Sequence, residues 1–231
     1  MLGPLDYFLW FLTTLLQAAA VVCALRAKCF LKFFALNFYL VAACVVTVGR
    51  YLVFRQHGAT SFEYTLFYYY SDALLTICLY FALMSLFLHV FGEMGVSRPI
   101  KLGAGFVLAL TAIVSFSIVH GSQHRLLTKF AYELSQVLYF VGAVLTYLLW
   151  GAVLKLKKTQ TRVIQIVLSL GVYFSAFAAS FALGTRFPNT DFWKVLCYIA
   201  ALWLPIAWGY AFLKFPATAQ LAPAQIASGA K

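Results

Sequence analysis

The apolar residues of this chain form long continuous runs separated by short polar clusters. Seven runs reach the length of about 20 residues that an α-helix needs to cross the hydrocarbon core of a bilayer. They cover residues 6–25, 31–54, 65–91, 101–120, 129–154, 160–183 and 192–213. A transmembrane barrel would show short segments of alternating polarity instead. The pattern therefore predicts an all-α membrane protein, a seven-transmembrane-helix bundle that occupies residues 1–215.

Turn-forming clusters divide the runs. Four of them are rich in Gly, Pro, Ser, Thr or Asn: HGATS (57–61), GEMGVSRP (92–99), HGSQHR (120–125) and TRFPNTD (185–191). The last residues, 216–231, are rich in Ala, Pro and Gln and predict a disordered tail. We therefore expect no soluble catalytic or signalling domain in this chain.

The composition agrees with a membrane protein. Hydrophobic residues make up 64% of the chain and charged residues 10%, whereas soluble domains are nearer half apolar and a quarter charged. The net charge of +11 would suggest nucleic acid in a soluble protein, but here the basic residues cluster between the apolar runs. We expect the lipid bilayer as partner, no nucleic acid, and a location in a bacterial inner (plasma) membrane.

The distribution of basic residues predicts the orientation of the bundle. Cytoplasmic loops carry an excess of Lys and Arg. Eleven of the 17 basic residues fall on the side that holds the C-terminus. The other side receives Arg50, Arg55, Arg125, Lys129, Arg186 and Lys194. This bias predicts that the N-terminus lies outside and the C-terminus in the cytoplasm.

One acid, Asp72 in FYYYSDALL (67–75), lies inside the third apolar run. Its position is about 9 Å from the midpoint of that run, within a hydrocarbon half-thickness of about 15 Å. A bare carboxylate there costs several kcal/mol or takes up a proton. Arg50 lies at a similar depth on the preceding run. We therefore predict an Arg50–Asp72 pair, which is either a structural ion pair or part of a functional site. A more specific hypothesis is that Asp72 takes part in proton coupling.

Further polar residues are predicted in the same leaflet. Glu133 and Gln136 are three residues apart, so they share one face of the fifth helix. A candidate ligand-binding cluster follows from the charged and polar residues at this depth: Arg50, Asp72, Glu133, Gln136 and Lys194. Aromatic residues would form its walls: Tyr68, Tyr69, Tyr132 and Trp193. The alternative is an ordinary aromatic belt, with lysines that reach to water from the helix ends.

Pro205 lies in the middle of the seventh run, between Trp203 and Trp208. Proline removes one helical hydrogen bond, so a kink is expected there. The kink is a candidate hinge, although a bend that fits the packing is the more ordinary interpretation.

Several chemistries do not fit the sequence. A retinal pigment needs a lysine deep in the seventh helix, whereas Lys194 and Lys214 lie at its ends. The histidines do not pair at one depth for haem, and the five cysteines are not spaced as metal ligands. HExxH, GxSxG and phosphate-loop motifs are absent from the sequence. We predict no enzyme, no cofactor and no metal site.

Three functions remain open. The first, which the sequence favours slightly, is a small sensing or binding module that acts through a membrane or cytoplasmic protein partner. The second is a small-solute or proton-coupled transporter that uses the polar cluster and the bend at Pro205. The third is a structural subunit of a membrane complex.

Overall fold

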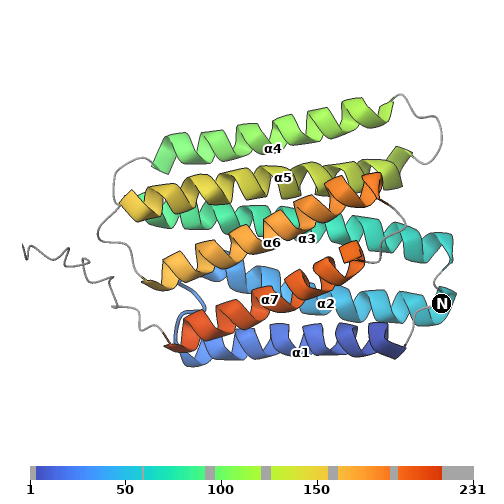
Figure 1. The fold of residues 1–231 in the computed structure, drawn as a ribbon, viewed down its shortest axis with the longest axis horizontal. Coiled ribbons are helices and arrows are strands. Elements are labelled where there is room, and N and C mark those ends of the chain that lie inside the picture. Colours follow the sequence, from blue (N-terminus) through green and yellow to red (C-terminus); the bar gives the residue numbers. More distant parts are fainter. Residues whose placement is uncertain are drawn as a thin grey trace, which may run out of the picture.

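The computed structural model describes residues 4–58, 60–91, 97–120, 126–155, 161–187 and 192–214, and all of the regular structure in these ranges is α-helical. Seven helices follow one another along the chain (Figure 1): α1 (Pro4–Arg26), α2 (Phe34–His57), α3 (Phe62–Phe91), α4 (Ser97–His120), α5 (Leu126–Lys155), α6 (Thr161–Arg186) and α7 (Phe192–Lys214). The prediction of an all-α fold is confirmed. The tail predicted over 216–231 lies outside the described residues.

Most helix bounds fall within four residues of the predicted runs, and α2 is shifted three residues along the chain. The shift follows from how α1 ends. Lys28 adopts a left-handed conformation, with φ 53°. The N–H of Cys29 donates to the carbonyl of Ala24 and that of Lys28 to Leu25, the two bonds of a Schellman C-cap. The following residues form a turn, so α2 begins only at Phe34.

Six helices, α1, α2, α3, α5, α6 and α7, are long and apolar enough to cross a membrane. Helix α4 has 24 residues but is not among these six. The protein is therefore an integral membrane protein with six span candidates in the described ranges. A seventh span and the orientation of the bundle remain predictions.

The six candidate spans form a closed ring. Helix α1 packs against α2 and α7, α2 against α3, α3 against α5, α5 against α6, and α6 against α7. Helix α4 lies outside the ring, where it packs on α5 and α3 (Figure 1). The chain runs back and forth along the bundle, so α1 begins at one end and α7 finishes at the other. We call these the Asp72 end and the Arg162 end, after a residue near each.

The half of the bundle next to the Arg162 end is tightly packed. Leu36, Leu83 and Trp208, from three different helices, are fully buried in one hydrophobic cluster. The indole N–H of Trp208 donates to the hydroxyl oxygen of Ser169 at 2.9 Å, which satisfies this buried donor across α6 and α7. Such packing leaves little space inside this half of the ring.

Arg162, one of the eleven basic residues counted on the side of the C-terminus, lies inside the bundle. Its side chain is only 3% exposed and donates to the Cys29 sulfur and, at 3.3 Å, to the carbonyl oxygen of Phe212. It is buried because it shares one face of α6 with Ile166 and Ser169, four and seven residues further on, and that face points into the bundle. Arg162 thus joins α6 to α7 and to the turn between α1 and α2.

Gly142 provides a test of the contact between α5 and α6. A Cβ atom at this position would overlap the ring of Phe174, which is fully buried. We expect Gly142→Ala to lower the free energy of unfolding by about 1–3 kcal/mol, the usual cost of overpacking. The measurement is unfolding by SDS in mixed micelles.

Gly151 on the same helix is the matched control, because a Cβ there meets no atom within 4 Å. Gly151→Ala should leave stability unchanged or raise it by about 0.5–1 kcal/mol, as alanine favours a helix over glycine. Equal effects of the two substitutions would contradict the close approach at Gly142.

Candidate functional site

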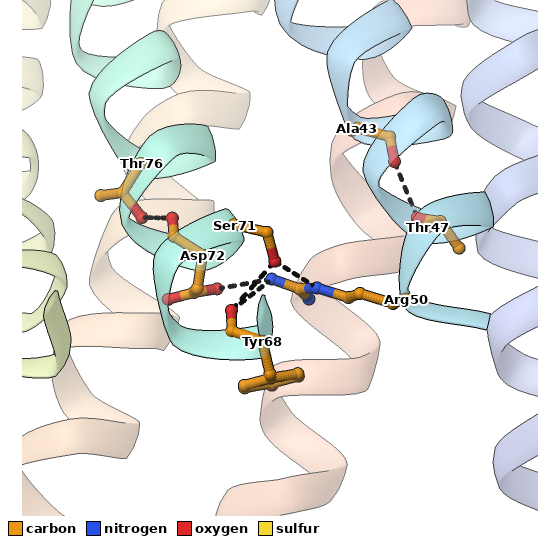
Figure 2. A network of polar contacts seen from close by, with 7 residues as sticks. All are labelled: Ala43, Thr47, Arg50, Tyr68, Ser71, Asp72 and Thr76. Atoms are coloured by element: carbon orange, nitrogen blue, oxygen red, sulfur yellow. Dashed lines mark hydrogen bonds and ion pairs between the residues drawn. The ribbon is translucent and has the colours of Figure 1, made fainter. Parts of the chain in front are cut away.

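An ion pair connects α2 to α3 near the Asp72 end. The Nη2 atom of Arg50 lies 3.7 Å from Oδ1 of Asp72, and the side chains are 14% and 26% exposed (Figure 2). The pair that the sequence predicts is therefore confirmed. A charge inside a membrane protein is costly unless it has such a partner.

Arg50 makes its shorter contacts with neutral oxygens. Its Nε donates to the Ser71 hydroxyl at 2.8 Å, and its Nη2 donates to the Tyr68 carbonyl oxygen at 3.2 Å. The guanidinium carbon also lies 4.3 Å from the centroid of the Tyr68 ring, within the range of a cation–π contact. Arg50 is thus anchored to α3 through Ser71 and Tyr68 as well as through Asp72, and the 3.7 Å contact with the carboxylate is longer than either hydrogen bond.

Helical spacing brings these groups together. Tyr68, Ser71 and Asp72 stand at positions i, i+3 and i+4, so they share the face of α3 that meets α2. The Tyr68 carbonyl accepts from both Arg50 and the Ser71 hydroxyl. Figure 2 shows Arg50 reaching across from α2 toward these residues, and one Asp72 oxygen turned away from it.

An interior cavity of about 360 Å³ lies inside the ring beside this pair. All six helices of the ring contribute to its lining. Arg50 and Asp72 line it, and it reaches as deep as Tyr39 on α2 and Leu79 on α3. Beyond that depth the buried side chains of Leu36 and Leu83 fill the bundle.

Three buried tyrosines, Tyr39, Tyr139 and Tyr173, line the interior cavity. Tyr139 has Thr76 and Tyr173 as hydrogen-bonding partners, and Tyr173 also pairs with Tyr39. The Thr76 hydroxyl in turn donates to the carbonyl oxygen of Asp72 at 2.8 Å. Hydroxyl groups thus continue from the ion pair into the middle of the bundle. Sequence analysis missed these residues, although Tyr139 and Tyr173 lie near the middle of their helices, too deep for an aromatic belt.

A second cavity of about 500 Å³, the end cavity, lies nearer the Asp72 end between α3, α5, α6 and α7. The four aromatic residues predicted as walls all line it: Tyr68, Tyr69, Tyr132 and Trp193. Asp72 and Cys197 belong to the linings of both cavities. Asp72 therefore lies between the two cavities.

The structure brings together only part of the predicted polar cluster. Arg50 and Asp72 are in contact, whereas Glu133 and Gln136 are half-buried on α5 and are not among the described residues that line either cavity. The side chain of Lys194 lies outside the described part of the chain. Ligand binding by any of these residues stays a prediction.

Pro205 is buried in the continuous helix α7. Because proline has no N–H, the carbonyl of Ala201 receives no helical hydrogen bond from residue 205. Ala201 lines the interior cavity. The interruption in α7 therefore falls at the cavity wall, while the role of Pro205 as a hinge is untested.

The fold and the site define a polytopic α-helical membrane protein with an ion pair and a tyrosine-rich cavity inside its bundle. Comparison of the chain with protein-family models, with curated proteins and with solved structures found no match. The chemistry of the cavities is therefore the basis for the function proposed below.

A double-mutant cycle tests the ion pair. Asp72→Ala should destabilise the protein more than Asp72→Ala combined with Arg50→Ala, because the single change leaves a cation without its partner. We expect a coupling of about 1–2 kcal/mol, within the range for residues in contact. The free energy of unfolding in mixed micelles measures it.

Arg55→Ala on the exposed face of the same helix serves as the control and should change stability by about 0.5 kcal/mol or less. Strictly additive losses at positions 50 and 72 would show that the two charges do not interact.

Proposed function

We propose that this protein is a small membrane sensing module that binds a small molecule in the cavities around Asp72 and acts through a protein partner. The observation that carries this proposal is the contrast between the two halves of the bundle. Cavities of about 360 and 500 Å³ both have Asp72 in their linings, whereas Leu36, Leu83 and Trp208 are fully buried in the other half. Ligand sites in proteins are concave, mostly apolar and supplied with a few polar groups, as these cavities are.

The contacts of Arg50 suggest how a bound molecule would be sensed. Arg50 links α2 to α3 through Ser71 and Tyr68, and its contact with Asp72 is the longest of the three. A ligand at Asp72 would therefore compete with the longest of these contacts and change how α2 and α3 meet. A partner protein that binds one arrangement of α2 and α3 more tightly than the other would respond to this change.

A transporter is the second candidate, and the position of Pro205 favours it. The interrupted hydrogen bond of α7 falls at Ala201, in the wall of the interior cavity. A helix broken beside a binding site is a common feature of transporters. In that case the structure would correspond to a state open toward the Asp72 end.

We also propose that α4 is a seventh span, with the N-terminus outside and the C-terminus in the cytoplasm of a bacterial inner (plasma) membrane. Its 24 residues would extend about 36 Å, more than the hydrocarbon thickness of about 30 Å. Exposed apolar side chains such as Leu102, Phe106 and Ile113 support contact with lipid. The bias of basic residues supports the orientation.

Reporters fused to the two termini test this topology. We expect a periplasmic reporter to be active at the N-terminus and a cytoplasmic reporter at the C-terminus. Activity of both fusions in the same compartment would contradict a seventh span.

A cavity-filling substitution tests the binding function. Ala43 is buried on α2 and lines the interior cavity, so Ala43→Phe should occupy space that a ligand needs. Val45 is exposed on the same helix, and Val45→Phe adds a ring of the same size there as the control. Purified wild type and both variants would be screened by thermal shift against a library of small amines, acids, sugars and neutral aromatics.

We expect compounds that raise the Tm of wild type and Val45→Phe by several degrees and lose this effect in Ala43→Phe. A library in which no compound distinguishes the variants would overturn the binding function. Uptake of such a compound into proteoliposomes would favour the transporter over the sensing module.

A further inference from the structure

The end cavity has an unusual lining. Seven of its eleven described lining residues are aromatic, from Tyr68 on α3 to Trp193 and Tyr198 on α7. Among these described residues Asp72 is the charged one. A cavity of rings with one carboxylate suits a particular ligand chemistry, because the face of an aromatic ring carries partial negative charge.

The rings along one wall are arranged edge to face. Tyr68 and Tyr69 meet at 85°, Tyr69 and Tyr132 at 88°, and Tyr132 and Phe181 at 72°, with centroids 5.3 to 6.0 Å apart. In this arrangement each contact uses the edge of one ring and the face of another. The neighbouring rings therefore hold one another in fixed orientations around the cavity.

Arg50, a cation of the protein itself, shows that Tyr68 and Asp72 accept a positively charged group. Arg50 places its guanidinium over the Tyr68 ring at 4.3 Å and beside the Asp72 carboxylate at 3.7 Å. Tyr68 and Asp72 thus already accept one cation, on the α2 side. Both residues also line the end cavity. The Asp72 oxygen that is turned away from Arg50 in Figure 2 is not engaged in this ion pair, and Ser135 on α5 is a further hydrogen-bonding partner of the carboxylate.

We propose that the end cavity binds a small organic cation, a primary or quaternary ammonium, with Asp72 as its counter-ion and the surrounding aromatic rings as its contacts. The inference rests on the proposed binding function and names the ligand class. A quaternary ammonium donates no hydrogen bond and is recognised by ring faces and a carboxylate. An anion would instead be repelled by the Asp72 charge, and a neutral ligand would gain no charge–charge attraction from it.

The two cations would then share one carboxylate. Arg50 keeps its hydrogen bonds to Ser71 and Tyr68 when a ligand approaches Asp72, so it weakens ligand binding without leaving the site. At a pH at which Asp72 stays ionised, removal of the Arg50 charge should consequently tighten the binding of an organic cation. This expected gain separates a ligand-binding role of Asp72 from a purely structural one.

The test compares benzyltrimethylammonium with neopentylbenzene, the neutral compound of nearly the same shape. Full-length protein in lipid nanodiscs would be titrated with each, and binding followed by quenching of tryptophan fluorescence and by thermal shift. We expect wild type to bind the cation at least tenfold more tightly than the neutral compound. Asp72→Asn should weaken cation binding at least tenfold and leave the neutral compound unaffected.

Two further variants keep the test decisive if Asp72→Asn folds poorly. Arg50→Gln should tighten cation binding severalfold. Tyr132→Leu, which removes a ring from the wall of the cavity, should weaken it severalfold, while Tyr132→Phe should preserve it. Glu63→Gln, at an exposed acid on the same helix as Asp72, is the control and should change nothing.

Three outcomes would each overturn the inference. They are equal binding of the cation and the neutral compound, an unchanged affinity for the cation in Arg50→Gln and Tyr132→Leu, and no saturable binding of the cation. If all the compounds that lose their effect in Ala43→Phe are neutral or anionic, the inference is overturned and the proposed binding function stands. A screen in which no compound loses its effect in Ala43→Phe would overturn both the inference and the proposed binding function.

Discussion

The cost of a charge in hydrocarbon is the constraint on which this structure depends. Asp72 lies within a membrane-spanning helix, and a carboxylate there needs a partner. Arg50 supplies the opposite charge from α2, while Ser71 and Tyr68 hold its guanidinium in place. The ion pair and these hydrogen bonds therefore link α2 to α3 near the Asp72 end.

The contrast between the two halves follows from the side chains that each contains. Toward the Arg162 end, Leu36, Leu83 and Trp208 are fully buried in one hydrophobic cluster, and near the middle of the bundle the close approach at Gly142 brings α5 onto Phe174. Near Asp72, large rings and hydroxyl groups line the ring of helices instead. The two cavities lie among these rings, beside the charged pair.

The sequence alone predicts the helices and the ion pair, because both follow from the positions of residues along the chain. Helices follow from the length of the apolar runs, and the pairing of Arg50 with Asp72 follows from depth along neighbouring helices. Which face of a helix points inward is a different question, because nearly every residue is apolar and the usual amphipathic signal is weak. For this reason the burial of Arg162 and the contributions of Tyr39 and Tyr173 to the cavity were missed.

Chemical access to Cys197 tests most directly whether the Asp72 half is hollow, because this residue lines both cavities. A variant that keeps only Cys197 would be treated, in intact membranes, with the charged reagent trimethylammonium-ethyl methanethiosulfonate. A variant that keeps only the buried Cys29 serves as the comparison. The thiolate is the reactive form and needs an environment that water reaches. We predict modification of Cys197 and none of Cys29 before unfolding, whereas an unreactive Cys197 in the folded protein would contradict a hollow site.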